Sequence, residues 1–257
     1  MGLYSTHHII FIVLSIVILA AIVLVFKFAL KTDKARDIFI RCMGGALVVS
    51  VIINRISLTV WNNTGFGALN LIPNTYCGMT SLLIGLFAAF GKRGMKAFHF
   101  LFYVELIGGL AGVFYPNFLD QHPSFFFLPT ISGMNHHALG VMLCVILVLG
   151  KWFTPSLKLW YVYPLGMSAY TLFGLFLIDP LGMTGSMNVD TPLISGTPLT
   201  WWFVLSVGTV LVVIVTFTID FIKIRRATKK VVEAAINEQA AHAEQTEQTA
   251  PPESDNK

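Results

Sequence analysis

Seven long stretches of hydrophobic residues alternate with short polar gaps along the chain. The stretches cover residues 8–30, 38–61, 74–91, 97–115, 128–150, 158–178 and 199–222. A helix needs about 20 mostly apolar residues to cross the hydrocarbon core of a bilayer. The pattern therefore predicts an all-α polytopic membrane protein with about seven transmembrane helices.

Positive charges mark every second gap between the hydrophobic stretches. Fifteen of the 17 Lys and Arg residues lie in or beside the gaps at 27–41, 92–96, 151–158 and 223–230. The other gaps, at 62–73, 116–127 and 179–198, carry only Asp120, Asp179 and Asp190 as formal charges. Cytoplasmic loops retain Lys and Arg whereas translocated loops are depleted of them. The alternation predicts an N-terminus outside the membrane and a C-terminus in the cytoplasm.

The composition also favours a membrane protein over a soluble domain. Charged residues make up 12% of the chain, against about 25% in soluble proteins, and the mean hydropathy is +0.74. We assign the net charge of +4 to cytoplasmic anchors that face anionic lipid, and not to nucleic-acid binding. Residues 1–228 are expected to form the transmembrane domain. Residues 229–257 are expected to form a polar cytoplasmic tail, helical to about Ala243 and disordered from Gln245.

Several polar side chains fall inside the hydrophobic stretches, where they cost free energy unless they face a cavity or a partner. These residues are Asn54, Arg55, Cys77, His99, Glu105, Asn135, His136 and His137. At a rise of 1.5 Å per residue, Arg55, Cys77 and the two adjacent histidines lie in the outer half of the bilayer. We therefore expect them to surround one pocket that faces outward.

Each of these residues also has a structural interpretation. Arg55 and Glu105 could form an ion pair that only holds helices together. Adjacent helical residues point about 100° apart, so at most one of His136 and His137 can face the pocket centre squarely. The other can hydrogen-bond a neighbouring helix. A cysteine in a membrane span is usually a small inert hydrophobe, and the three cysteines of the chain do not indicate a disulfide framework.

Cys77 differs from the other two cysteines through its neighbours. It follows Pro73-Asn74-Thr75 at the start of a predicted helix, where free backbone N–H groups stabilise a thiolate and an oxyanion. A cysteine with a positioned histidine is the minimal apparatus for acyl transfer. The histidine pair does not indicate a metal site, because the usual i, i+4 spacing is absent. We expect no cofactor.

Three motifs resemble those of a known family of membrane proteins. The stretch LIPNTYC, which ends at Cys77, resembles the cysteine motif of the YwaF-type bacterial proteins, relatives of the eukaryotic transmembrane protein 164 group. The stretch NHHAL at 135–139 resembles that family's histidine motif, and His137 matches the family histidine. Residues 179–195 resemble the segment between the last two spans. The order and spacing of the motifs agree over roughly residues 40–220.

The eukaryotic relatives are viewed as lipid acyltransferases in which the Cys accepts the acyl group and the His is its base. The resemblance therefore implies a lipid acyltransferase or lipid hydrolase in a multi-pass, bacterial cytoplasmic membrane protein. Cys77 would be the nucleophile and His137 its base, with His136 and Asn135 orienting the pair. Asn74, or N–H groups near the following Gly78, would stabilise the oxyanion.

The expected partner is a membrane lipid that enters from the outer leaflet, and nucleic acid is excluded. Arg55, beside Asn54, has a planar guanidinium that suits a lipid phosphate, and Glu105 is expected to hold it in place. The chain departs from the family pattern at two positions. Gly78 stands where a polar residue is common, and His136 is an additional histidine.

Two other classes of protein fit the same residues. A transporter or permease could use Arg55, Glu105 and the histidines as a proton relay or substrate site, although the chain has no obvious internal repeat. A non-catalytic assembly or sensor protein is the third interpretation. The last hydrophobic stretch has no lysine before Lys223, which excludes a retinal Schiff base there.

Overall fold

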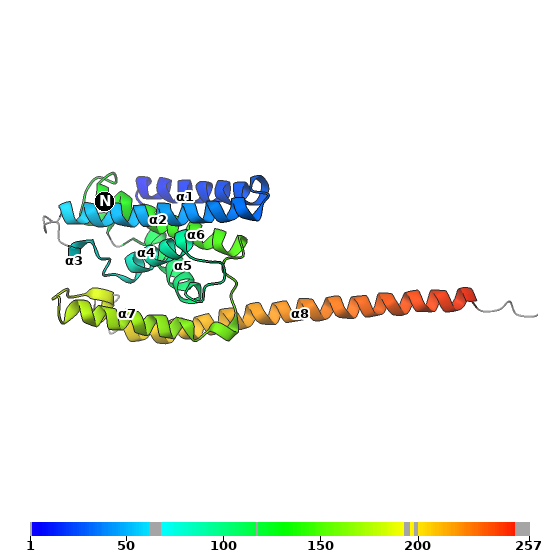
Figure 1. The fold of residues 1–257 in the computed structure, drawn as a ribbon. Coiled ribbons are helices and arrows are strands. Elements are labelled where there is room, and N and C mark those ends of the chain that lie inside the picture. The colour runs from blue at the N-terminus through cyan, green and yellow to red at the C-terminus, as the bar shows by residue number, and fades with distance from the viewer. Residues whose placement is uncertain (1, 62–67, 117, 193–195, 198–199, 250–257) are drawn as a thin grey trace, which may run out of the picture.

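The computed structural model describes residues 2–61, 68–116, 118–192, 196–197 and 200–249, and within these ranges it contains helices and no strands (Figure 1). The α-helices are α1 (Thr6–Leu24), α2 (Asp33–Trp61), α3 (Ala68–Leu71), α4 (Tyr76–Phe90), α5 (Phe98–Phe114), α6 (Leu128–Leu149), α7 (Val162–Ile178) and α8 (Trp201–Thr249). A π-helical turn, Val25–Ala29, extends α1, and short 3-10 helices lie at Leu119–Gln121, Leu157–Leu159 and Ser186–Asn188. The all-α prediction is confirmed.

The seven predicted spans correspond to α1, α2, α4, α5, α6, α7 and α8. Among the described residues, five of these helices are long and apolar enough to cross a membrane, α7 when it is counted with the turn before it as Leu157–Ile178. The exceptions are α4, with 15 residues, and α5, with 17 residues. Both are apolar but lie at or below the shortest length that spans a bilayer, about 17 residues.

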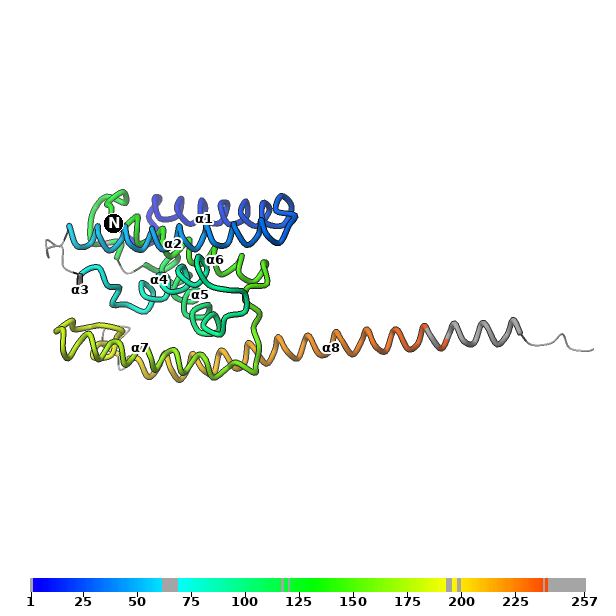
Figure 2. The backbone as a smooth tube through the Cα atoms, in the orientation of Figure 1, coloured from blue at the N-terminus to red at the C-terminus, as the bar shows by residue number. Residues whose placement is uncertain are grey.

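The helices form a bundle in which α2 packs against α4 and α6, and α5 packs against α4, α6 and α7. Helix α1 contacts α6, and α7 pairs with α8 on the side of the bundle opposite α1 and α2 (Figures 1 and 2). Most residues of α5 are buried, whereas α1 is mostly exposed and contributes only His8 to the buried set. Exposed apolar side chains cover the outer helices. This distribution is expected when the surrounding solvent is lipid.

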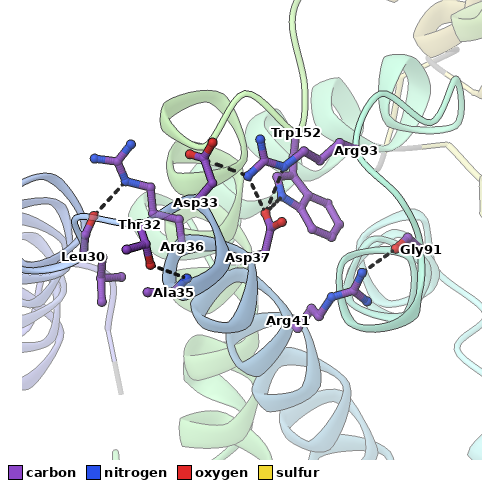
Figure 3. A network of polar contacts seen from close by, with 10 residues as sticks. All are labelled: Leu30, Thr32, Asp33, Ala35, Arg36, Asp37, Arg41, Gly91, Arg93 and Trp152. Atoms are coloured by element: carbon purple, nitrogen blue, oxygen red, sulfur yellow. Dashed lines mark hydrogen bonds and ion pairs between the residues drawn. The ribbon is translucent and has the colours of Figure 1, made fainter.

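The four Lys- and Arg-rich gaps meet at one end of the bundle. Asp37, before the second span, accepts hydrogen bonds from Arg93 Nε at 2.9 Å and Trp152 Nε1 at 2.6 Å (Figure 3). Arg41 donates to the carbonyl oxygen of Gly91 at 3.1 Å. Lys223 in the fourth gap donates to the carbonyl oxygen of Pro155 in the third, at 3.0 Å. The four gaps thus lie at one end of the bundle. This arrangement is required when successive helices run up and down and every second gap is charged.

The charge-poor gaps meet at the opposite end. The backbone N–H of Met187 donates to the carbonyl oxygen of Asn74 at 2.8 Å, and the rings of Trp61 and Phe127 lie 4.2 Å apart. These contacts join the segments that follow α2, α5 and α7. The charge rule assigns this end to the outside of the cell; that orientation stays a prediction.

Helix α8 continues far beyond the bundle, as the rod in Figures 1 and 2 shows. The helix includes Lys229 and the residues that follow it, and the division of the chain into a transmembrane domain and a cytoplasmic tail stays a prediction. The helix continues to Thr249, further than the expected end near Ala243, because residues 245–249 contain neither Pro nor Gly. The part of the predicted disordered tail at 250–257 lies outside the described residues.

Candidate active site

A cavity of about 410 Å³ lies at the charge-poor end of the bundle. It is enclosed by α2, α4, α6 and the segments that precede or follow them. Its lining residues are Val51, Asn54, Arg55, Leu58, Pro73, Thr75, Tyr76, Cys77, Gly78, Phe118, Gln121, Pro129, Gly133, His136, His137 and Asn188. Thr75 and Gln121 are also exposed, so the cavity reaches the surface. The predicted pocket of polar residues from several helices is therefore present.

Cys77 lies in the first turn of α4, at the wall of the cavity. Thr75 caps this helix, because its side chain accepts a hydrogen bond from the Gly78 N–H at 3.2 Å. The sulfur packs against α5: a Cβ atom built on Gly108 would lie 2.8 Å from Cys77 Sγ. Such a distance is shorter than van der Waals contact, so the cysteine occupies space that only a glycine leaves open.

His137 packs against the same face of α5, one turn further along. A Cβ atom on Gly112 would lie 2.6 Å from His137 Nε2 and would overlap the imidazole carbons. The ring stacks on Phe118 with centroids 6.2 Å apart. Its Nδ1 is buried and has no hydrogen-bond partner within the described residues. A buried polar atom without a partner is unusual and is explained by a bound water or ion, by strain, or by a catalytic role.

Gly108 and Gly112 place the sulfur and the imidazole against one face of α5. Residues four apart on a helix lie on one face, about 5–6 Å from each other. Cys77 and His137 therefore contact α5 about one helical turn apart, and both line the cavity. The sequence analysis missed these two glycines. The G-x-x-x-G spacing within an apolar helix was the available signal, because it marks close helix approach.

His136 also lines the cavity, but its Nδ1 is engaged with the carbonyl oxygen of Ser132 at 3.2 Å. A carbonyl oxygen only accepts, so Nδ1 carries the proton and Nε2 is left as an acceptor. The rings of His136 and His137 lie 4.2 Å apart. Both histidines thus line the cavity. His136 is the one whose ring is hydrogen-bonded within its own helix.

Asn54 and Arg55 line the cavity from α2, as predicted. Asn54 Nδ2 donates to the carbonyl oxygen of Pro129 at 3.2 Å and to Ser132 Oγ at 3.1 Å, which ties α2 to the start of α6. Arg55 Nη2 donates to the carbonyl oxygen of Asn70 at 2.8 Å.

Glu105 does not meet Arg55, contrary to expectation. It is 1% exposed, and Ser81 Oγ lies 2.9 Å from each of its carboxylate oxygens. A Cβ atom on Gly140 would overlap its carboxylate, so Glu105 is enclosed between α4, α5 and α6 and is not among the residues that line the cavity. No ion pair between Arg55 and Glu105 forms within the described chain.

Asn135 and Asn74 are likewise not brought to the cavity wall. Asn135 is exposed while its neighbours His136 and His137 are buried, because the helical turn rotates successive side chains by about 100°. Asn74 is half-buried, and its carbonyl oxygen binds the N–H of Met187.

Residues 3–219 match the model of the TMEM164 family. The chain belongs to the TMEM164 family. The match covers the whole bundle and ends before the tail. No curated protein and no solved structure matches the chain. The resemblance to the transmembrane protein 164 group is thus confirmed, and the finer assignment to the YwaF-type branch stays a prediction.

In this TMEM164-family chain the cavity has further polar residues that were not selected from the sequence, among them Gln121 and Asn188. Gln121 comes from the segment after α5, and its Nε2 donates to Thr130 Oγ1 at 2.9 Å. Asn188 comes from the segment after α7 and has a φ of +46°. Asparagine tolerates this left-handed conformation better than most residues. Asn188 belongs to the third motif that carried the family resemblance, which was the available signal.

Proposed function

We propose that the protein transfers acyl groups between membrane lipids through a thioester on Cys77. The observation that carries this proposal is the shared cavity of Cys77 and His137, with each side chain against a glycine one helical turn apart on α5. A thiol with an adjacent imidazole can act as nucleophile and base. The apolar helices around the cavity fit a lipid substrate.

In the first half-reaction His137 accepts the proton of the Cys77 thiol. The sulfur attacks the carbonyl carbon of a lipid ester, a C–S bond forms, and the carbonyl oxygen becomes an oxyanion. The C–O bond to the leaving lipid then breaks, and His137 returns its proton to that alkoxide. The products are the acylated Cys77 and a lipid alcohol.

In the second half-reaction His137 accepts the proton of an acceptor hydroxyl. The hydroxyl oxygen attacks the thioester carbonyl, the C–S bond breaks, and the proton returns to the sulfur. When water is the acceptor, the same steps hydrolyse the lipid. The first-turn N–H groups of Tyr76 and Cys77 are the best oxyanion donors, because they precede the hydrogen-bond ladder of α4 and the Gly78 N–H already binds Thr75.

Substitution of Glu105 gives different expected results for an acyltransferase and for a proton-coupled transporter. The experiment is an acyl-transfer assay with the purified protein in vesicles that contain an acyl-labelled lipid and an unlabelled lysolipid. We expect Glu105→Gln to keep transfer within about twofold, because Gln retains the shape and one acceptor for Ser81 and the carboxylate does not touch the reacting atoms.

Two results would decide against acyl transfer. One is an absence of label exchange by the unmodified protein. The other is a wild-type uptake of solute or protons that Glu105→Gln abolishes and Cys77→Ala leaves intact. Cys144→Ala serves as a matched control in both assays, because that buried thiol lies outside the cavity.

A further inference from the structure

We infer that Arg55 binds the phosphate of a lipid whose hydrocarbon chain lies in an apolar hollow between α2 and α6. The inference rests on the proposed function in taking this lipid as the acyl-transfer substrate. The proposed binding site has two parts, a cationic group at the cavity and an apolar space that adjoins the cavity.

Arg55 lines the cavity, and the protein uses only part of its donor capacity. Its Nη2 binds the carbonyl oxygen of Asn70 at 2.8 Å, whereas its Nε is buried and without a partner within the described residues. The guanidinium is a permanent cation with five N–H donors in a planar fork. An oxyanion that enters the cavity would meet this cation, because Arg55 lines it.

The cavity favours a negatively charged ligand overall. Its lining includes Arg55, His136 and His137, and no Asp or Glu is among the lining residues in the described chain. A buried cation without an opposite charge is costly, so an anionic ligand has more to gain here than a neutral one. Arginine–phosphate pairs are among the strongest hydrogen-bonded pairs in proteins.

The hollow adjoins the cavity at Pro129. It measures about 260 Å³ and is lined by Ile56, Ser57, Val60, Trp61, Phe127, Leu128 and Pro129. Pro129 lines both spaces, and Asn54, which lines the cavity, donates to the Pro129 carbonyl oxygen. Trp61 and Leu128 are each 55% exposed, as expected for residues that face hydrocarbon.

The two spaces together fit one amphiphilic molecule. With its phosphate on Arg55, a glycerophospholipid can extend a chain past Pro129 into the hollow. Its ester carbonyls lie only a few bonds from the phosphate, so they remain in the cavity that Cys77 lines. Free phosphate would use Arg55 alone, and a fatty acid would offer a carboxylate in place of the phosphate.

Lipid binding to the full chain carrying Cys77→Ala tests this inference without any acyl chemistry. The protein is held in a neutral detergent and titrated with a fluorescent phosphatidic acid. We expect Arg55→Gln to weaken binding about tenfold or more, and Arg55→Lys by a smaller factor, because Lys keeps the charge and loses the fork. Lys34→Gln, which removes an exposed positive charge at the other end of α2, should change binding by less than about twofold.

The second half of the test concerns the hollow. Val60→Trp should weaken the binding of phosphatidic acid several-fold, because the larger side chain fills space that the hydrocarbon chain needs. Inorganic phosphate should compete only at far higher concentration than the lipid.

Equal affinity in the Arg55→Gln and Lys34→Gln proteins would overturn the phosphate site. Fatty acid or inorganic phosphate that binds as tightly as the lipid would overturn the assigned ligand. If Arg55→Gln fails to fold, Arg55→Lys and Val60→Trp decide the outcome. Since Cys77 is absent throughout, these results are independent of whether a thioester forms.

Discussion

Replacement of His137 by Ala is expected to slow acyl transfer about 10²- to 10⁴-fold, the usual contribution of a general base. His136→Ala should slow it by less than about tenfold, because it is His137 that packs on the face of α5 against which the Cys77 sulfur lies. His137 packs against Gly112 in the cavity that Cys77 lines, and its Nδ1 has no partner in the described chain. The measurement is the initial rate of label exchange in vesicles.

The comparison of the two histidines contains its own control. Both are buried neighbours on α6 with rings 4.2 Å apart, so a general loss of packing would affect both variants. A larger loss in His136→Ala than in His137→Ala would contradict the assignment of His137 as the base. Thermal unfolding of each variant shows whether a rate change follows from instability.

Replacement of Gly112 by Ala is expected to reduce transfer about 10²-fold, because a displacement of about 1 Å in a catalytic group has an effect of this size. The added Cβ would overlap the His137 ring and push it away from its position. Gly108→Ala should act in the same way on Cys77, whose sulfur lies 2.8 Å from the position of the added atom.

Gly45→Ala is the matched control for the two glycine variants. Gly45 also lies inside a helix, α2, and a Cβ atom there meets nothing within 4 Å. It should leave the rate unchanged and stabilise the protein by up to about 1 kcal/mol, the difference in helix propensity between Gly and Ala. Equal rates for Gly112→Ala and Gly45→Ala would show that the contact with α5 has no role in catalysis.

Much of the fold followed from two patterns in the sequence. Apolar stretches of about 20 residues located seven helices, and the Lys- and Arg-rich gaps indicated which helix ends lie together, as the contacts of Asp37 with Arg93 and Trp152 bear out. The lengths of α4 and α5 were less predictable. Helix α4 begins after Pro73 and α5 ends before Phe118, and both of these residues line the cavity. Hydropathy does not distinguish a helix end from an apolar loop, so the predicted spans did not locate these ends.

The candidate site was only partly predictable, for reasons of geometry. Depth along the helix axis correctly grouped Arg55, Cys77 and the two histidines, because depth depends only on residue number. The direction of each side chain depends on how helices rotate against one another. For this reason Glu105 contacts Ser81 and not Arg55, and Asn135 turns away from the cavity.

On the proposed mechanism Cys77 carries an acyl group during turnover. Intact-mass spectrometry detects such a group when the purified protein is incubated with lipid and then divided between buffer and neutral hydroxylamine. We expect an added acyl mass that hydroxylamine removes, that Cys77→Ala lacks and that Cys144→Ala retains. The thioester mechanism would be contradicted if neither the unmodified protein nor His137→Ala carried an adduct. It would also be contradicted if the adduct persisted in Cys77→Ala.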